Sequence, residues 1–390
     1  MVASRRRPKH APMFQAIRLL AAAALIAALA LAQTADPGSK KADADATRIG
    51  KKDPFTEGEA KAMTALGILA YGPLPWGDGL RTDAVDAVLG ANRILWFETA
   101  HFRFGCNLAT IGIPEEPDAR KLVNGELQRL NGKWSKMPER ASKLDPWLRA
   151  HLYAQRAEEL YADFATLIGS DETARPNLGA PDKFLILLFQ KRSDLARYLD
   201  RFCGMKAQNS TRFTTRKSGQ GLLVLSAEAD DVHDEAAVHA QFRFLLMQTL
   251  QDALRGMPYW LSIGVAHHYE RQVPTNLINA GMRETDHVDA GTQHKWPQKM
   301  RARAARETLC VPFATLCTST DFGYFEHVQV WSRVDYLLAL DRSKFGKFVA
   351  GLAGNGSSSR QTELLEEIFG MDTETFDRQW REWATKTYPK

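Results

Sequence analysis

The sequence is poor in cysteine and lacks several common catalytic motifs. Its 390 residues include only four cysteines, and none of them forms a C-x-x-C pair. A structural zinc knuckle or a thioredoxin-type site therefore has no support. The sequence also has no G-x-S-x-G, P-loop or G-x-G-x-x-G segment, so it offers no motif for a serine hydrolase or a nucleotide-binding protein. The sequence has no stripe of basic residues of the kind that would indicate nucleic-acid binding.

The net charge of +5 comes from the first residues of the chain. Five basic and no acidic residues stand in residues 1–32, so the rest of the sequence has a net charge near zero. The basic start is followed by an Ala/Leu-rich run at 19–31, too short to cross a bilayer comfortably, and then by small residues at 30–32. This pattern predicts a cleavable signal peptide over 1–32, a periplasmic or secreted protein, and no stable membrane span after cleavage. An uncleaved N-terminal anchor is the alternative.

Export favours oxidised cysteines. Four cysteines allow three connectivities, and we favour Cys310–Cys317 together with Cys106–Cys203. The first pair would close a short loop before the C-terminal helices. Four free, buried thiols are the alternative.

Composition and periodicity divide the mature chain into five parts. We expect a flexible polar linker at 33–54, an N-terminal helical extension at 55–92, an α+β region at 93–272, a loop region without periodicity at 273–320, and a C-terminal helical subdomain at 321–390. Within the α+β region, strands are expected at 93–105, 183–190, 211–215 and 221–226. Long helices are expected at 116–136, at 146–168, from the end of an acidic cluster at 230–235 to about 254, and at 259–271.

Two blocks in the last two helices carry a resemblance. The first reads His239-Ala-Gln-Phe-Arg243, and the second reads Trp260-Leu-Ser-Ile-Gly-Val-Ala266. Their order and spacing resemble the peptidase MA-like family, a gluzincin-type branch of the zincin superfamily, over about residues 93–388. The resemblance implies a zincin-like α+β fold, with a small antiparallel or mixed sheet packed on the motif-helix pair and a helical subdomain after it.

The catalytic residues of such a peptidase are mostly replaced. An active member binds zinc through two histidines one turn apart and a glutamate on the next helix, and a further glutamate acts as the general base. By the resemblance, His239 matches the first ligand, Ala240 replaces the base, Arg243 replaces the second histidine, and Ile263 replaces the third ligand. Because a guanidinium repels a dication, we expect no catalysis and no cofactor.

The resemblance implies that the remnant cleft would bind a peptide or an envelope protein, and we expect the strand at 221–226 to form its edge. A purely structural envelope protein is not distinguished from this by the sequence. The alternative from another class is a metal-dependent hydrolase or peptidase with a displaced zinc site. An antiparallel pair of helices would place Glu235, His239 and His267 together one turn from the usual position. Tyr324 and His327 are candidate cleft residues near the position that stabilises the oxyanion.

Overall fold

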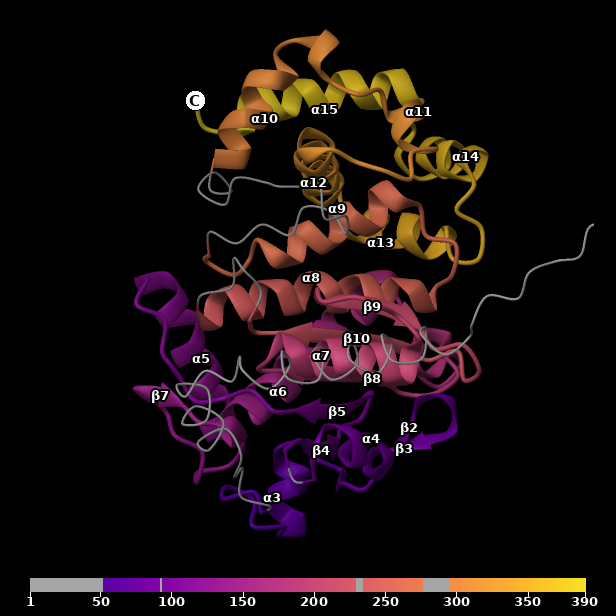
Figure 1. Cartoon of the computed structure of the whole chain (residues 1–390). Helices are drawn as coiled ribbons and strands as arrows, with labels where there is room; N and C mark the ends of the chain where they lie inside the picture. The colour runs from indigo at the N-terminus through magenta and orange to yellow at the C-terminus, as the bar shows by residue number, and fades with distance from the viewer. Residues whose placement is uncertain (1–51, 92, 229–233, 276–294) are drawn as a thin grey trace, which may run out of the picture. The chain divides into compact units, whose positions relative to one another are not determined.

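The computed structural model is an α+β protein with a six-stranded mixed sheet and a largely helical C-terminal region (Figure 1). It describes residues 52–91, 93–228, 234–275 and 295–390. These residues belong to one compact unit, Ile49–Lys390. The expected signal peptide at 1–32 lies outside them. In the described part of the chain, no helix has the length and apolar character needed to cross a membrane.

The sheet has a parallel centre and antiparallel margins. Its strands, in spatial order, are β1 (Ala70–Tyr71), β4 (Leu95–Glu98), β5 (Phe102–Cys106), β8 (Phe184–Phe189), β10 (Gly221–Ser226) and β9 (Thr211–Thr214). The parallel pairs are β5 with β8 and β8 with β10. The unbroken apolar run of β8 suits this central position, because both faces of the strand are buried. The expectation that 221–226 forms an edge was wrong, since β9 lies outside it.

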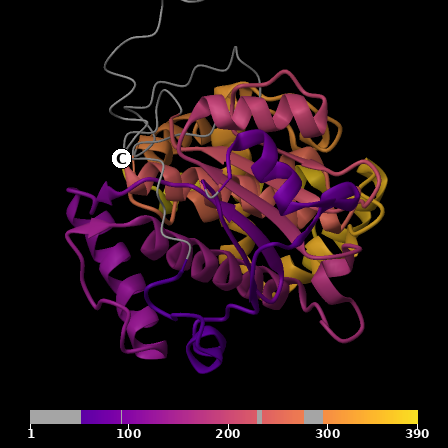
Figure 2. The ribbon, with the colours of Figure 1, turned by 60° about the horizontal axis from the view of Figure 1, so that its bottom comes forward.

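Alternate side chains of the central strand enter different cores. Phe184, Ile186 and Leu188 belong to the larger core, beneath α6 (Pro146–Ile168) and α8 (Glu235–Ala253). Leu185, Leu187 and Phe189 belong to a smaller core on the opposite face, with α4 (Thr82–Leu89) and α7 (Arg192–Tyr198). The sheet is thus covered by helices on both faces, as the turned view also shows (Figure 2).

This division bears on the predicted disulfides. All four cysteines are thiols in the structure. Cys106 is buried in the larger core, whereas Cys203 packs against the smaller core on the other side of the sheet. The predicted Cys106–Cys203 bond is therefore wrong, because the sheet separates the two sulfurs. Cys310 and Cys317 flank the short helix α11 (Phe313–Leu316), and their pairing stays a prediction.

Helices form successive layers on the larger face of the sheet. α8 packs on β10 and against α9 (Tyr259–Glu270), and α9 packs in turn against α12 (Tyr324–Leu340) (Figure 1). The remaining C-terminal helices are α10 (Trp296–Ala304), α13 (Arg342–Gly351), α14 (Ser358–Phe369) and α15 (Thr373–Thr387). The boundaries follow local signals: the Asp145 and Asp234 carboxylates accept backbone N–H bonds at the starts of α6 and α8, and Gly169 ends α6 in a left-handed conformation.

Three of the predicted segments differ from the structure. The loop expected at 273–320 contains α10, whose apolar stripe is only Trp296, Met300 and Ala304 among basic residues, too sparse to stand out as periodicity. The extension expected to be helical at 55–92 also supplies β1 to the main sheet and a small hairpin, β2 (Pro75–Trp76) with β3 (Leu80–Arg81). The expected linker ends earlier than 54, because Asp53 is buried and its carboxylate lies 2.9 Å from His151 Nε2.

Candidate functional site

Contacts between α8 and α9 fix the register of the two predicted motif helices. Near the turn that joins them, the Gln251 side chain donates to the Ser262 carbonyl at 3.2 Å. Further along, the Phe244 and His267 rings lie with their centroids 4.8 Å apart. Because Ile263 follows Ser262, it lies beside α8 about three turns from His239, roughly 16 Å along the helix axis. The structure does not bring these two motif positions together.

His239 is turned away from α9. Its Nδ1 lies 3.9 Å from Glu126 Oε1 on α5 (Pro117–Lys133), and its side chain is buried. Phe244 faces α9, and Ala240, one turn before it, lies on the same face of α8. The positions that meet α9 are thus one residue later than the sequence predicted. Neither of them ionises.

Arg243 reaches α9 only through the length of its side chain. Its Nε donates to the Tyr269 carbonyl at 2.9 Å, and an Nη donates to Gln272 Oε1 at 2.6 Å. Both acceptors are at the C-terminal end of α9, where unpaired carbonyls favour a cation. Arg243 therefore caps a helix end in this structure, and it does not stand beside Ile263.

Glu235 points inward, but two arginines hold its carboxylate. Arg149 Nη2 lies 2.7 Å from Glu235 Oε2, and Arg156 Nη1 donates to Oε1 at 2.6 Å. Arg156 also holds Glu126, through a 2.7 Å contact from Nη2. Burial by itself would raise the pKa of Glu235, but Arg149 and Arg156 outweigh it and the pKa is lowered. The result is a buried, charge-balanced network linking α5, α6 and α8.

The displaced metal set is not assembled. Glu235 faces Arg149 and Arg156, His239 faces α5, and His267 faces α12. Throughout the described ranges, no three His, Cys, Asp or Glu side chains are placed to hold a metal ion. The offset argument failed in both translation and rotation: His267 lies opposite Phe244 and not opposite His239, and His239 and His267 face different sides of the α8–α9 pair.

His267 instead belongs to a buried relay of three ionisable groups. Its Nδ1 lies 2.7 Å from Glu270 Oε2, and its Nε2 lies 2.9 Å from His327 Nδ1 on α12. All three side chains are buried, and the rings of Phe244 and Trp296 lie beside His267. His327 Nε2 has no hydrogen-bond partner in the described structure.

The sequence predicted separate roles for the two histidines of this relay: His267 in the displaced metal set and His327 in the cleft. The pairing between them was not predicted, because sixty residues separate His267 from His327. Glu270 was missed, although its i,i+3 spacing from His267 on one helix was a usable signal. The other candidate cleft residue, Tyr324, lies nearby: its hydroxyl accepts from Lys299 Nζ at 2.9 Å, and its ring is 6.2 Å from that of Trp296.

The relay predicts that the fold loses stability in mild acid. Burial, followed by the charge on His267, lowers the pKa of His327 to about 3, and burial lowers that of His267 well below its usual value. Protonation at the unfolded-state pKa of about 6.5 therefore favours unfolding, and stability falls as the pH drops from about 6.5 toward 3. Each such histidine contributes a slope of up to about 1.4 kcal/mol per pH unit. Urea unfolding of wild type and His327→Gln across this range should show a shallower slope in the variant; equal slopes would contradict the prediction.

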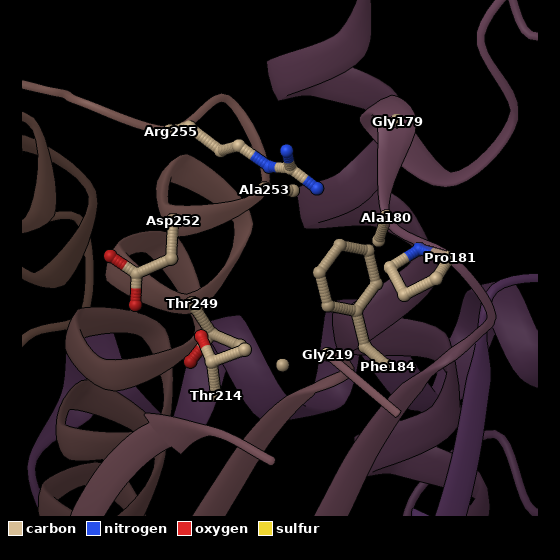
Figure 3. Close-up of a pocket in the computed structure, with 11 residues that line it drawn as sticks. Gly179, Ala180, Pro181, Phe184, Thr214, Gly219, Thr249, Asp252, Ala253 and Arg255 are labelled. Atoms are coloured by element: carbon tan, nitrogen blue, oxygen red, sulfur yellow. The ribbon is translucent and has the colours of Figure 1, made fainter. Parts of the chain in front are cut away.

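A separate pocket of about 290 Å³ opens where β9 and β10 approach the C-terminal end of α8 (Figure 3). Its apolar wall includes Pro181 and Phe184. Its polar lining residues are Thr214, Thr249, Asp252 and Arg255. Gly221 leaves part of this space open, because a Cβ there would lie 2.9 Å from Thr249 Cγ2 and 3.0 Å from the Phe184 ring.

The charged groups of this pocket are unequally neutralised. Arg212 on β9 donates to the Asp252 carboxylate and also to Gln248 Oε1 at 3.1 Å. Burial raises the pKa of Asp252, and Arg212 partly offsets that rise. Arg255 is exposed, and no hydrogen bond or ion pair of its guanidinium occurs with the described residues. The pocket therefore presents an uncompensated positive charge.

The strand beside the pocket has a free edge among the described residues, because β9 pairs only with β10. The Thr215 N–H donates to the Gln220 carbonyl, so the main-chain groups of Thr215 face inward, toward β10. Inward and outward groups alternate along an antiparallel strand. The N–H groups of Thr214 and Arg212 therefore face outward.

Comparison with known proteins does not assign this chain to a family. A scan against protein-family models finds no match, and a search of curated proteins finds none.

Proposed function

We propose that this chain is an exported, non-catalytic relative of zinc peptidases that binds an extended peptide, or an extended segment of an envelope protein, along β9. The observation that carries the proposal is the outward-facing main chain of β9 beside the 290 Å³ pocket. An unpaired strand edge offers backbone hydrogen bonds to any extended chain, and an adjoining pocket can select one of its side chains. The export part of the proposal rests on the signal-peptide pattern in the sequence of residues 1–32.

Only the order of the layers supports a zincin-like fold, because positions 239 and 263, which would share a zinc site in such a fold, lie about three turns apart along α8. A mixed sheet packs on α8, α9 packs antiparallel on α8, and helices follow. The face of α8 that meets α9 presents Ala240 and Phe244, and neither side chain can bind zinc or accept a proton. These residues give no support for zinc-peptidase chemistry at the α8–α9 contact, which is why we propose binding without catalysis.

A metal-dependent hydrolase built on Glu235, His239 and His267 is not favoured. The Glu235 carboxylate is held by two arginines at 2.6 and 2.7 Å, and the histidines belong to separate clusters. Moving the carboxylate to a metal would leave Arg149 buried without its counter-charge, at a cost of several kcal/mol, while Arg156 would keep only Glu126.

The proposal is tested by replacing Thr214 with proline. Proline removes one outward N–H and introduces its ring at the edge, while the inward hydrogen bonds of β9 remain. We expect peptides selected from a random library by the wild-type protein to bind Thr214→Pro at least about tenfold more weakly. Fluorescence anisotropy with labelled peptides measures the change. A chelator should leave wild-type binding unaltered.

Thr214→Val is the matched control, since it keeps both the N–H and a β-branched side chain. It should bind as the wild type does, and thermal unfolding should show that both variants are folded. The proposal fails if the library yields no binding peptide, or if proline and valine at this position give the same affinity.

A further inference from the structure

We propose that the pocket at the end of β9 recognises a carboxylate group of the bound chain, with Arg255 as the recognising residue. The inference rests on the proposed function and specifies its ligand class: peptides that place an acidic side chain or a C-terminal carboxylate beside Thr214. The reasons lie in the direction of Arg255, in the pairing of the neighbouring charges, and in the size of the cavity.

Arg255 extends over the pocket. Figure 3 shows its guanidinium reaching toward Ala180 and the Phe184 ring, while the Asp252 carboxylate points to the other side. A guanidinium presents several N–H donors in one plane and binds a carboxylate through two of them at once. With no described partner of its own, Arg255 has these donors available for a ligand.

The turn that carries Arg255 is fixed by the C-terminal region. Arg255 has a positive φ of 56°, and the Gly354 N–H donates to the Arg255 carbonyl at 2.8 Å and to the Leu254 carbonyl at 3.0 Å. Gly256, also at positive φ, follows it and packs against the backbone of the 354–356 segment. The backbone that carries Arg255 is therefore ordered before a ligand binds, so its ordering adds no cost to binding.

The nearby acidic groups do not cancel this charge. Asp252 is paired with Arg212. Asp78, under the β9–β10 turn, accepts backbone N–H bonds from Arg216, Lys217 and Ser218, at 2.7 to 3.2 Å. The Arg216 and Lys217 side chains are themselves exposed on this turn. The mouth of the pocket is therefore positive, which favours an anionic ligand over a neutral or cationic one.

Size limits the ligand to one residue. A cavity of about 290 Å³ lies at the lower limit for small-molecule sites. Phe184, Pro181 and Ala180 supply an apolar wall opposite Thr214 and Thr249. These features match one residue that has both aliphatic carbons and a carboxylate, held at the end of a chain paired with β9.

Three small probes test the pocket without the strand edge. N-acetyl-leucine carries a terminal carboxylate, N-acetyl-glutamic acid α-amide carries only a side-chain carboxylate, and N-acetyl-leucinamide carries neither. NMR titration should show a saturable shift of the Arg255 Nε–H signal with at least one carboxylate probe and not with the amide. The carboxylate probe that binds identifies the source of the anion. Binding of the amide as tightly as the carboxylates, or binding of none, overturns the proposal.

Variants of Arg255 complete the test. Arg255→Gln should weaken carboxylate binding at least about tenfold, because a charge-assisted pair is lost, and Arg255→Lys should retain part of it. Arg306→Gln removes another exposed arginine, from a different region, and should have no effect. Loss of peptide binding in Thr214→Pro together with unchanged probe binding in Arg255→Gln would refute this inference and leave the proposed function standing.

Discussion

Replacing Arg156 by methionine is expected to lower the free energy of unfolding by about 3–5 kcal/mol, which is enough to prevent folding of a marginally stable chain. Arg156 is buried and holds both Glu126 and Glu235, at 2.7 and 2.6 Å. Without it, the charges of two buried carboxylates remain, and only Arg149 stays to balance Glu235. Denaturant unfolding followed by circular dichroism measures the loss.

Arg129→Met is the matched control for this change. Arg129 pairs with Glu159 through two hydrogen bonds of 2.9 Å and joins α5 to α6, but the two side chains are 48% and 43% exposed. Its loss should cost less than about 1 kcal/mol, because water screens the exposed pair. Equal losses in the two variants would show that burial of the network does not determine its contribution.

The second large effect is expected at Gly346, where α13 meets the end of α6. A Cβ at this position would lie 1.8 Å from the Leu167 carbonyl oxygen. Backbone cannot move aside as a flexible side chain does, so Gly346→Ala must separate the two helices and should cost about 3 kcal/mol or more. Urea unfolding provides the measurement.

Gly132 supplies the opposite case. It lies in α5, is exposed, and a Cβ there would meet nothing within 4 Å. Gly132→Ala should therefore stabilise the protein by roughly 0.5–1 kcal/mol, because alanine has the higher helix propensity. If Gly346→Ala were as harmless as Gly132→Ala, the close approach of α6 and α13 would not exist in solution.

Local sequence signals were sufficient for most elements of secondary structure. The predicted helix at 146–168 matches α6 at both ends, since Asp145 and Gly169 are capping residues that act within one turn. The predicted strand at 183–190 contains β8, whose apolar run is short and bounded by polar residues. Such signals depend only on neighbours in the chain. They carry no information about which strand lies at an edge.

The candidate site depended on rotation and order in space, which only the tertiary structure decides. One residue along a helix turns a side chain by about 100°, so His239 faces α5 while Ala240 and Phe244 face α9. A sequence motif read one residue out of phase therefore predicts the wrong face.

The same reason explains the pairings that sequence reasoning missed. Contact between His267 and His327 requires α9 to pack on α12, sixty residues later in the chain. Strand pairing across the sheet also decides that β9, and not β10, is the edge strand. Composition, capping and the apolar runs thus determined the helices and strands of this protein. The packing of α8 between the sheet and α9 determined which residues meet. These contacts join segments that are far apart in the chain, and the residues next to each segment in the sequence do not specify its partner.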